Sequence, residues 1–137
     1  MAQTDPRTAA PPKGGLVPYI QVEGAMKAAD FYVKAFGGEI VGAQPPDEQG
    51  RTVHVHLYIN GSSLMLNDPF PEYCHSQGTP AGFNLTLIVD DIDAAFARAV
   101  EAGCSVIMPV ADMFWGDRYG QLRDPCGVTW AMNAPAR

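Results

Sequence analysis

The sequence describes one folding pattern twice. Residues 18–41 align with residues 85–107 when Val22 is placed on Val89, an offset of 67 positions (89 minus 22), with one residue skipped at Phe36. Each copy has the pattern of a strand, a helix and a second strand, and two more strands joined by a glycine turn follow it. The chain is therefore predicted to be a duplicated β-α-β-β-β module. Paired modules of this kind enclose a cleft, where proteins usually bind small molecules.

Local signals place the helices and turns within each copy. Apolar side chains recur at helical spacing: Ala29, Tyr32, Val33 and Phe36 in the first copy, and Ile92, Ala95, Phe96, Ala99 and Val100 in the second. Gly37 and Gly103 follow these runs and are expected to end the helices. Asn60-Gly61 lies between two apolar runs, and both residues tolerate the positive φ of a type I′ turn, so a tight hairpin is predicted there.

These signals divide the chain into a tail and one domain. Residues 1–14 hold Pro, Ala and Thr without an apolar run, and we expect a flexible tail that is no signal peptide. Residues 15–133 form the domain, with the first module at about 16–67 and the second at about 83–133. Residues 68–82 are rich in Pro and Gly and are interpreted as a linker, with a functional flap as the alternative.

Composition narrows the class of protein. The chain has 137 residues, 47% of them hydrophobic, which suits one domain with a real core. The net charge of -6 and the scattered Lys and Arg exclude nucleic acid as a partner, and no run approaches the length of a membrane span. Three cysteines, Cys74, Cys104 and Cys126, are odd in number and far apart. They favour free thiols and a cytoplasmic protein.

Four phrases of the sequence carry a family resemblance: AADFYVKAFGGEI, INGSSLMLND, LIVDDIDAAFARAVEAG and FWGDRYGQLRDPCG. With these phrases in this order on a duplicated scaffold, the chain resembles the vicinal oxygen chelate superfamily of glyoxalase I, extradiol dioxygenases and bleomycin-resistance proteins, and most closely its PhnB-like branch. The resemblance implies an α+β fold in which two tandem βαβββ modules form a cup-shaped mixed sheet. It also implies that a second chain completes or borders each cup, so a homodimer is expected. Fold likeness alone does not fix an activity.

The resemblance also identifies where a metal would bind. In metal-dependent relatives, His or Glu ligands project into the cup from the first and last strands of each module, and the matching positions here are Val17, Met65, Asn84 and Ala131. Three of these side chains offer no useful donor, and Asn84 alone is a poor ligand. We therefore expect no metal cofactor. The alternative is one divalent metal on His54 and His56, which share a strand face; Cys74 and His75 are weaker candidates.

Further candidates line the expected cup. Strand alternation puts Tyr19 and Gln21 on the face of Val17, and Thr86 on that of Asn84. With His54, His56 and the metal-equivalent positions, they form the expected lining of the cup. Trp115 and Asp117 either form an aromatic wall with a charged group, or Asp117 and Arg118 pair to fasten the strand to a neighbouring module or subunit. Trp130 is expected to point the other way, towards the helices.

The leading hypothesis is a protein that binds a small, partly apolar or aromatic molecule in its cup without the usual metal. If the chain is an enzyme, the resemblance implies a lyase, isomerase or dioxygenase. The runner-up hypothesis is a metal-dependent lyase or dioxygenase using His54 and His56. A third hypothesis is a non-catalytic assembly module. No glycine-rich loop follows a first strand to hold S-adenosylmethionine, so the methyltransferase label sometimes attached to the family is discounted.

Overall fold

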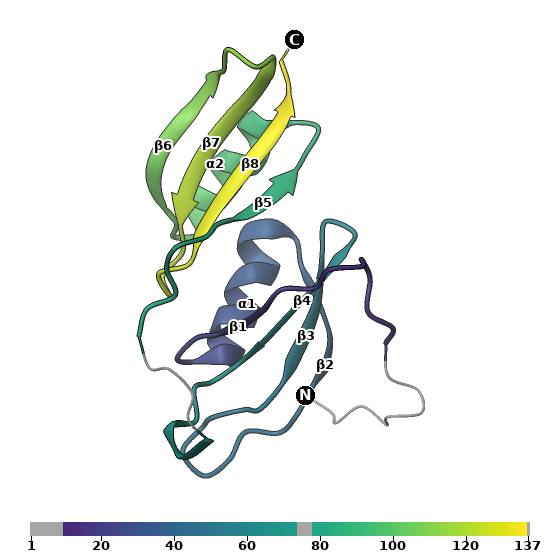
Figure 1. Ribbon diagram of the computed structural model, residues 1–137, viewed down its shortest axis with the longest axis vertical. Coiled ribbons are helices and arrows are strands. Elements are labelled where there is room, and N and C mark those ends of the chain that lie inside the picture. The colour runs from purple at the N-terminus through teal and green to yellow at the C-terminus, as the bar shows by residue number, and fades with distance from the viewer. Residues whose placement is uncertain (1–9, 74–77, 137) are drawn as a thin grey trace.

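The computed structural model describes residues 10–73 and 78–136 and confirms the duplicated α+β fold (Figure 1). The first module runs through β1 (Tyr19–Gln21), α1 (Ala25–Phe36), β2 (Glu39–Ala43), β3 (Val55–Ile59) and β4 (Ser62–Asn67). A 3-10 turn, η1 (Pro71–Tyr73), follows it. The second module runs through β5 (Leu85–Ile88), α2 (Ile92–Ala102), β6 (Ser105–Asp112), β7 (Asp117–Arg123) and β8 (Thr129–Pro135).

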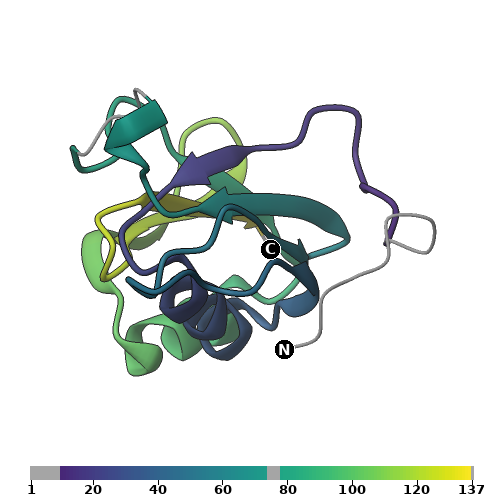
Figure 2. The ribbon, with the colours of Figure 1, turned by 90° about the horizontal axis from the view of Figure 1, so that it is seen from below.

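The two modules have the same topology. Their sheets have the orders β1-β4-β3-β2 and β5-β8-β7-β6, and in each the first strand runs parallel to the last while the other pairs are antiparallel. Seen along the long axis of the molecule, α1 and α2 lie on the same side of the two sheets (Figure 2). Each sheet therefore has one face covered by a helix and an opposite face on which no α-helix of residues 10–73 and 78–136 lies.

The helix-facing side of each sheet holds its core. Val55, Leu57 and Ile59 of β3 pack with Ala29 and Tyr32 of α1, and Leu122 and Met132 belong to a second core with Phe96 of α2. Val33 and Val100, which were expected on the buried stripes, are more than a third exposed. In α1 the small residues Ala25, Ala28 and Ala35 take the buried positions instead, so the helix approaches the sheet closely and Val33 lies on its flank.

The predicted turns and caps are confirmed. Asn60 and Gly61 both have positive φ, at 53° and 82°. Gly37 and Gly103 are the C-caps of the helices, and the side chain of Asp91 accepts from the Ala94 amide at 3.1 Å as the N-cap of α2. The start of α1 has no such residue.

The capping group of α1 comes instead from the far end of the module. Gly24 precedes the helix and makes no side-chain capping bond. The buried Asp68, just after β4, accepts hydrogen bonds from the amides of Gly24 at 2.7 Å and Ala25 at 3.3 Å. A carboxylate at a helix N-terminus satisfies otherwise unpaired N–H groups and is favoured by the helix dipole. Asp68 thus fixes α1 to the segment that leads into the linker.

The modules dock through their helices and through one buried carboxylate. Trp130 of β8 points to the helices, as predicted, and its ring lies 4.4 Å from that of Phe36 and 5.2 Å from that of Tyr32. Asp124, in the β7–β8 turn, accepts from the Tyr32 hydroxyl at 2.5 Å and from Trp130 Nε1 at 2.9 Å. It also accepts from the amides of its own turn, so a turn residue links α1 to the second module.

The remaining expectations about the chain receive partial answers. Within the described ranges no helix is long and apolar enough to cross a membrane. Cys104 and Cys126 are free thiols, as predicted, whereas Cys74 lies outside the described residues. Most of the tail, residues 1–9, is also outside them. Its last part is held: Pro11 O accepts from the Tyr58 hydroxyl at 2.7 Å, and Lys13 exchanges hydrogen bonds with Ser63.

Candidate functional site

A row of rings lies on the face of the first sheet opposite α1, and residues 11–13 cover its Tyr58 end. Because Val55, Leu57 and Ile59 point into the core, strand alternation directs His54, His56 and Tyr58 to the opposite face. Their rings follow one another, with centroids 6.4 Å apart for His54 and His56 and 5.2 Å apart for His56 and Tyr58. Tyr19 of β1 extends the row, 5.7 Å from His54. The sequence placed Tyr19, His54 and His56 here, and the structure brings these three together.

Both histidines of the row are held by hydroxyl groups, and neither forms an ion pair within the described part of the chain. His54 Nδ1 lies 2.8 Å from the Tyr19 hydroxyl, and His56 Nε2 lies 2.7 Å from Ser63 Oγ. Burial lowers the pKa of His54, and burial followed by repulsion from His54 lowers the pKa of His56. Both rings are therefore neutral at physiological pH; His54 is partly exposed, whereas His56 is buried beneath the row.

The four positions expected for metal ligands do not supply a metal site. Met65 lies beside Tyr19 in the parallel β1–β4 register, and Ala131, fully buried, lies beside Thr86 in β5–β8. With the half-buried Val17 and with Asn84, they offer one amide and no carboxylate or imidazole. Such a donor set does not fit the divalent metal of the metal-dependent relatives.

The alternative metal pair also lacks its third ligand. Across residues 10–73 and 78–136, no three His, Cys, Asp or Glu side chains are grouped closely enough to hold a metal ion. His54 and His56 instead bind hydroxyl groups. Cys74 and His75 lie outside the described residues.

A cavity of about 640 Å³ opens beside the ring row. Its walls come from β1, from the end of β4 and from the segment before β5. They are formed by Tyr19, Ile20, Gln21, Asn67, Gly78, Thr79, Pro80, Ala81 and Phe83. Of the predicted lining, Tyr19 and Gln21 are therefore on this cavity, while Asn84 and Thr86 border a separate one of about 250 Å³ between the modules.

The FWGDRYG segment lies far from this cavity within one chain. Trp115 is half-exposed at the tip of the β6–β7 hairpin, which Figure 1 places at the end of the molecule opposite the first module. Asp117 accepts from Asn133 Nδ2 at 3.1 Å within the second sheet. Arg118 pairs with Asp93 of α2 at 2.9 Å and with Asp112 of β6 at 3.1 Å, rather than with Asp117. The fastening that Arg118 provides is therefore internal to the second module.

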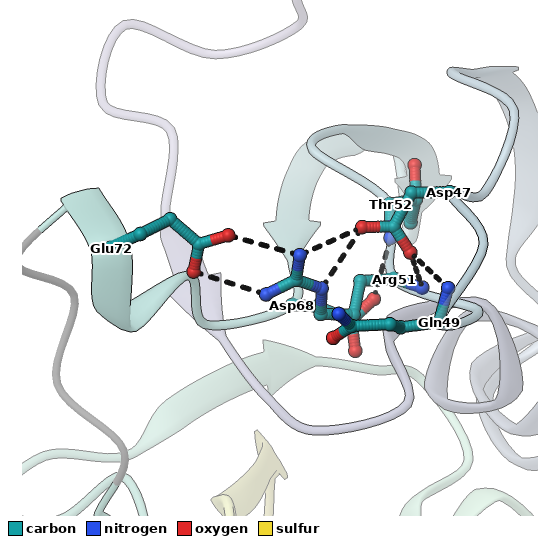
Figure 3. A network of polar contacts seen from close by, with 6 residues as sticks. All are labelled: Asp47, Gln49, Arg51, Thr52, Asp68 and Glu72. Carbon is teal, nitrogen blue, oxygen red and sulfur yellow. Dashed lines mark hydrogen bonds and ion pairs between the residues drawn. The ribbon is translucent and has the colours of Figure 1, made fainter.

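A polar network holds the loop that leads into β3 (Figure 3). Arg51 forms ion pairs with Asp47 at 2.9 Å and with Glu72 of η1 at 3.0 Å. Hydrogen bonds from Arg51 lower the pKa of both carboxyl groups, led by its backbone amide at Asp47 and by its side chain at Glu72. Beneath this surface network, the buried Asp68 accepts from the Thr52 amide at 2.8 Å. The loop before His54 is thus tied to the segment that follows β4.

Sequence reasoning did not single out Asn67 or residues 78–83. Asn67 could have been found, because it lies two residues after Met65 and so shares its strand face. The segment 78–83 gave no such signal, since its composition marks it only as a connection between modules. It reaches the cavity through the path of the chain after β4, which depends on tertiary packing.

Comparisons with known proteins agree with this architecture. The family model of the Glyoxalase/Bleomycin resistance protein/Dioxygenase superfamily matches residues 16–132. The uncharacterised protein Rv0887c of Mycobacterium tuberculosis is 43% identical over 131 residues, covering 89% of this chain and 75% of that protein.

Two solved structures extend the comparison. TnmS3, an antibiotic-binding protein from Streptomyces sp. CB03234, superposes with a TM-score of 0.66 at 30% identity, covering 88% of this chain and 93% of that one. The PhnB protein from Bacillus cereus, described as a putative 3-demethylubiquinone-9 3-methyltransferase, superposes with a TM-score of 0.70 at 23% identity over 88% of this chain and 99% of that one. At that identity the second likeness speaks for the fold alone.

Proposed function

The chain belongs to the Glyoxalase/Bleomycin resistance protein/Dioxygenase superfamily, and we propose that it binds an uncharged, partly aromatic small molecule in its cup without a metal. The observation that carries this proposal is the row of Tyr19, His54, His56 and Tyr58 on the face of the first sheet opposite α1, where Tyr19 is 49% exposed beside the cavity. Stacked and edge-on rings are the surface that a planar apolar molecule prefers. TnmS3, which binds an antibiotic, shows that a similar chain can be a binding protein.

The absence of suitable ligands supports the metal-free part of the proposal. Metal-assisted isomerisation or ring cleavage needs a Lewis acid or redox centre in the cup, and Val17, Met65 and Ala131 have no donor for one. The thiols give no alternative chemistry. Burial raises the pKa of Cys104 to about 12 and that of Cys126 to about 11, so neither is a thiolate at neutral pH.

The proposed cup is completed by a second copy of the chain. In both sheets no α-helix of the described residues covers the second face, and the second module exposes large apolar side chains on its strands and hairpin. These are Ile88, Val106, Ile107, Met108, Phe114 and Trp115. A monomer rarely exposes so many large apolar side chains, and a two-fold dimer would lay the second module of one chain over the ring row of the other.

Complementation between two variants tests the shared cup. Tyr19→Ala removes a ring of the first module, and Trp115→Ala removes one of the second. Each is expected to weaken binding of the neutral probe 2-naphthol by about 1 to 3 kcal/mol, as for an aromatic anchor. Val100→Ala is the control, because that side chain lies on α2, away from the proposed cup, and is 38% exposed.

The two variants are then refolded together. A homodimer with shared cups regains wild-type affinity in about a quarter of its sites, because half of the dimers are mixed and each mixed dimer has one intact cup. If the mixture binds 2-naphthol no more tightly than either variant alone, the shared cup is rejected. A lack of 2-naphthol binding by the wild type rejects the aromatic ligand.

Elemental analysis tests the absence of a metal. Protein produced in metal-rich medium is expected to carry no stoichiometric zinc, nickel, manganese or iron. One metal per chain that disappears in the His54→Ala, His56→Ala double variant would establish the metal-dependent alternative.

A further inference from the structure

Asn67 is an unpaired polar group on the wall of the 640 Å³ cavity. It is the last residue of β4, lies beside Gln21 in the parallel β1–β4 register and is 9% exposed. Its Oδ1 is buried and has no hydrogen-bond partner among the described residues. Leu66, its neighbour in β4, packs in the core, so strand alternation directs Asn67 to the cup side.

Such a group costs folding stability. A buried amide oxygen has given up its water and receives no hydrogen bond in return. Native proteins satisfy nearly all such atoms, so each one that remains needs an explanation, such as a functional role or a bound group that supplies the missing partner. The neighbouring polar groups do not relieve Asn67. The Tyr19 hydroxyl is engaged by Val53 O and His54, and the Asp68 carboxylate by the amides of Gly24 and Thr52.

The rest of the cavity wall indicates the chemistry of the missing partner. None of its lining residues carries a formal charge, since Tyr19 is the one titratable group among them and burial raises the pKa of its phenol. Pro80, Ala81 and Phe83 give the opposite wall an apolar surface. The amides of Gln21 and Asn67 each present a donor and an acceptor in one plane. A charged ligand would lose its hydration here without gaining an ion pair.

We propose that Asn67, with Gln21 beside it, recognises an uncharged planar ligand group that carries a hydrogen-bond donor and acceptor side by side, as a primary carboxamide or a lactam does. This inference rests on the proposed function, because it names the ligand class of the same cup. Asn67 acts as the specificity residue, since an apolar ligand without a donor leaves its Oδ1 unpaired. A site built to hydrogen-bond an N–H group rejects analogues that lack it.

Three matched probes test the proposal: 2-naphthamide, N,N-dimethyl-2-naphthamide and 2-naphthoate. They share the ring system and differ in the donor and in charge. The wild type is expected to bind 2-naphthamide about tenfold more tightly than either of the others. Asn67→Leu, which keeps the size of the side chain and removes its polar atoms, is expected to bind the primary and the dimethyl amide equally. Asn67→Asp, which keeps an acceptor but adds charge, is expected to lose affinity for all three.

The stability of Asn67→Leu gives an independent readout. If the partner of Asn67 Oδ1 is a ligand group, Asn67→Leu leaves the melting temperature of the ligand-free protein unchanged or raises it. A lowered melting temperature together with retained discrimination between the two amides overturns the proposal and makes Asn67 a structural residue. If the wild type binds both amides equally, the inference fails and the aromatic cup stands. If it binds neither these probes nor 2-naphthol, both fail.

Discussion

Replacement of Asp124 by alanine is expected to destabilise the protein by about 3 to 5 kcal/mol. Asp124 is 4% exposed and receives side-chain hydrogen bonds from Tyr32 and Trp130, which are themselves 0% and 2% exposed. The substitution leaves a buried hydroxyl and a buried indole N–H without an acceptor, each at a cost of about 1 to 3 kcal/mol. The amides of Cys126 and Val128 lose their acceptor too. The loss of stability measured when one member of a buried polar network is removed falls in the same range.

Urea unfolding followed by circular dichroism measures this loss, and Tyr32→Phe is the matched control. That variant removes one hydrogen-bond donor and leaves no buried polar group without a partner, so its free energy of unfolding is expected to fall by about 1 kcal/mol. In the double variant, the Tyr32 hydroxyl that Asp124→Ala would leave without an acceptor is absent. Its free energy of unfolding should therefore fall by about 1 to 3 kcal/mol less than the sum of the single losses. A change under 1 kcal/mol for Asp124→Ala, or strictly additive losses, would refute the idea that this carboxylate joins the modules.

Three further outcomes are expected. Burial lowers the pKa of His54 and His56, so their NMR resonances should titrate below pH 6.5. Because the unfolded chain then binds more protons than the folded one, the unfolding free energy should fall as the pH drops below 6.5. Titration of these histidines at or above pH 6.5 contradicts this. In a Cys74→Ser variant, Cys104 and Cys126 should resist iodoacetamide at pH 8 until the protein unfolds, because their pKa values are about 12 and 11; rapid labelling of the native protein contradicts this. Sedimentation at micromolar concentration should show a homodimer, and a sharp monomer near 14.7 kDa would show that one chain closes its own cup.

The fold could be predicted because its determinants are local. The duplicated strand and helix pattern, Asn60-Gly61 and the glycine caps each depend on neighbours in sequence, and the structure has all of them. Strand alternation likewise placed Trp130 against the helices. Where local patterning failed, as at Val33 and Val100, the cause was tertiary: which flank of a helix meets the sheet depends on the docking of α1 and α2.

The candidate site could be predicted only in part, because it joins segments that are distant in sequence. Tyr19, His54 and His56 share a face through the pairing of strands, and alternation was enough to group them. Local patterning does not reveal the roles of Asp68, just after β4, and Asp124, in the β7–β8 turn. Their burial and their bonds to the start of α1 and to Tyr32 arise from contacts 44 and 92 residues apart, for which the sequence holds no local sign.

The two copies of the module have kept one topology and acquired different open faces, which bears on the kind of ligand that suits the cup. On the face opposite α1 the first copy has Tyr19 and His54 at the surface and His56 and Asn67 buried behind them, and these side chains are aromatic or polar and hold no charge near neutrality. The second exposes aliphatic side chains and Trp115. Within one chain these faces lie end to end rather than opposed. The proposed two-fold dimer would bring one of each together twice and create two identical cups with one hydrogen-bonding wall and one apolar wall. A molecule with a planar polar edge and an apolar body matches both walls at once. A wholly apolar molecule would leave Asn67 without a hydrogen-bond partner, and a wholly polar one would make no apolar contacts with the second wall.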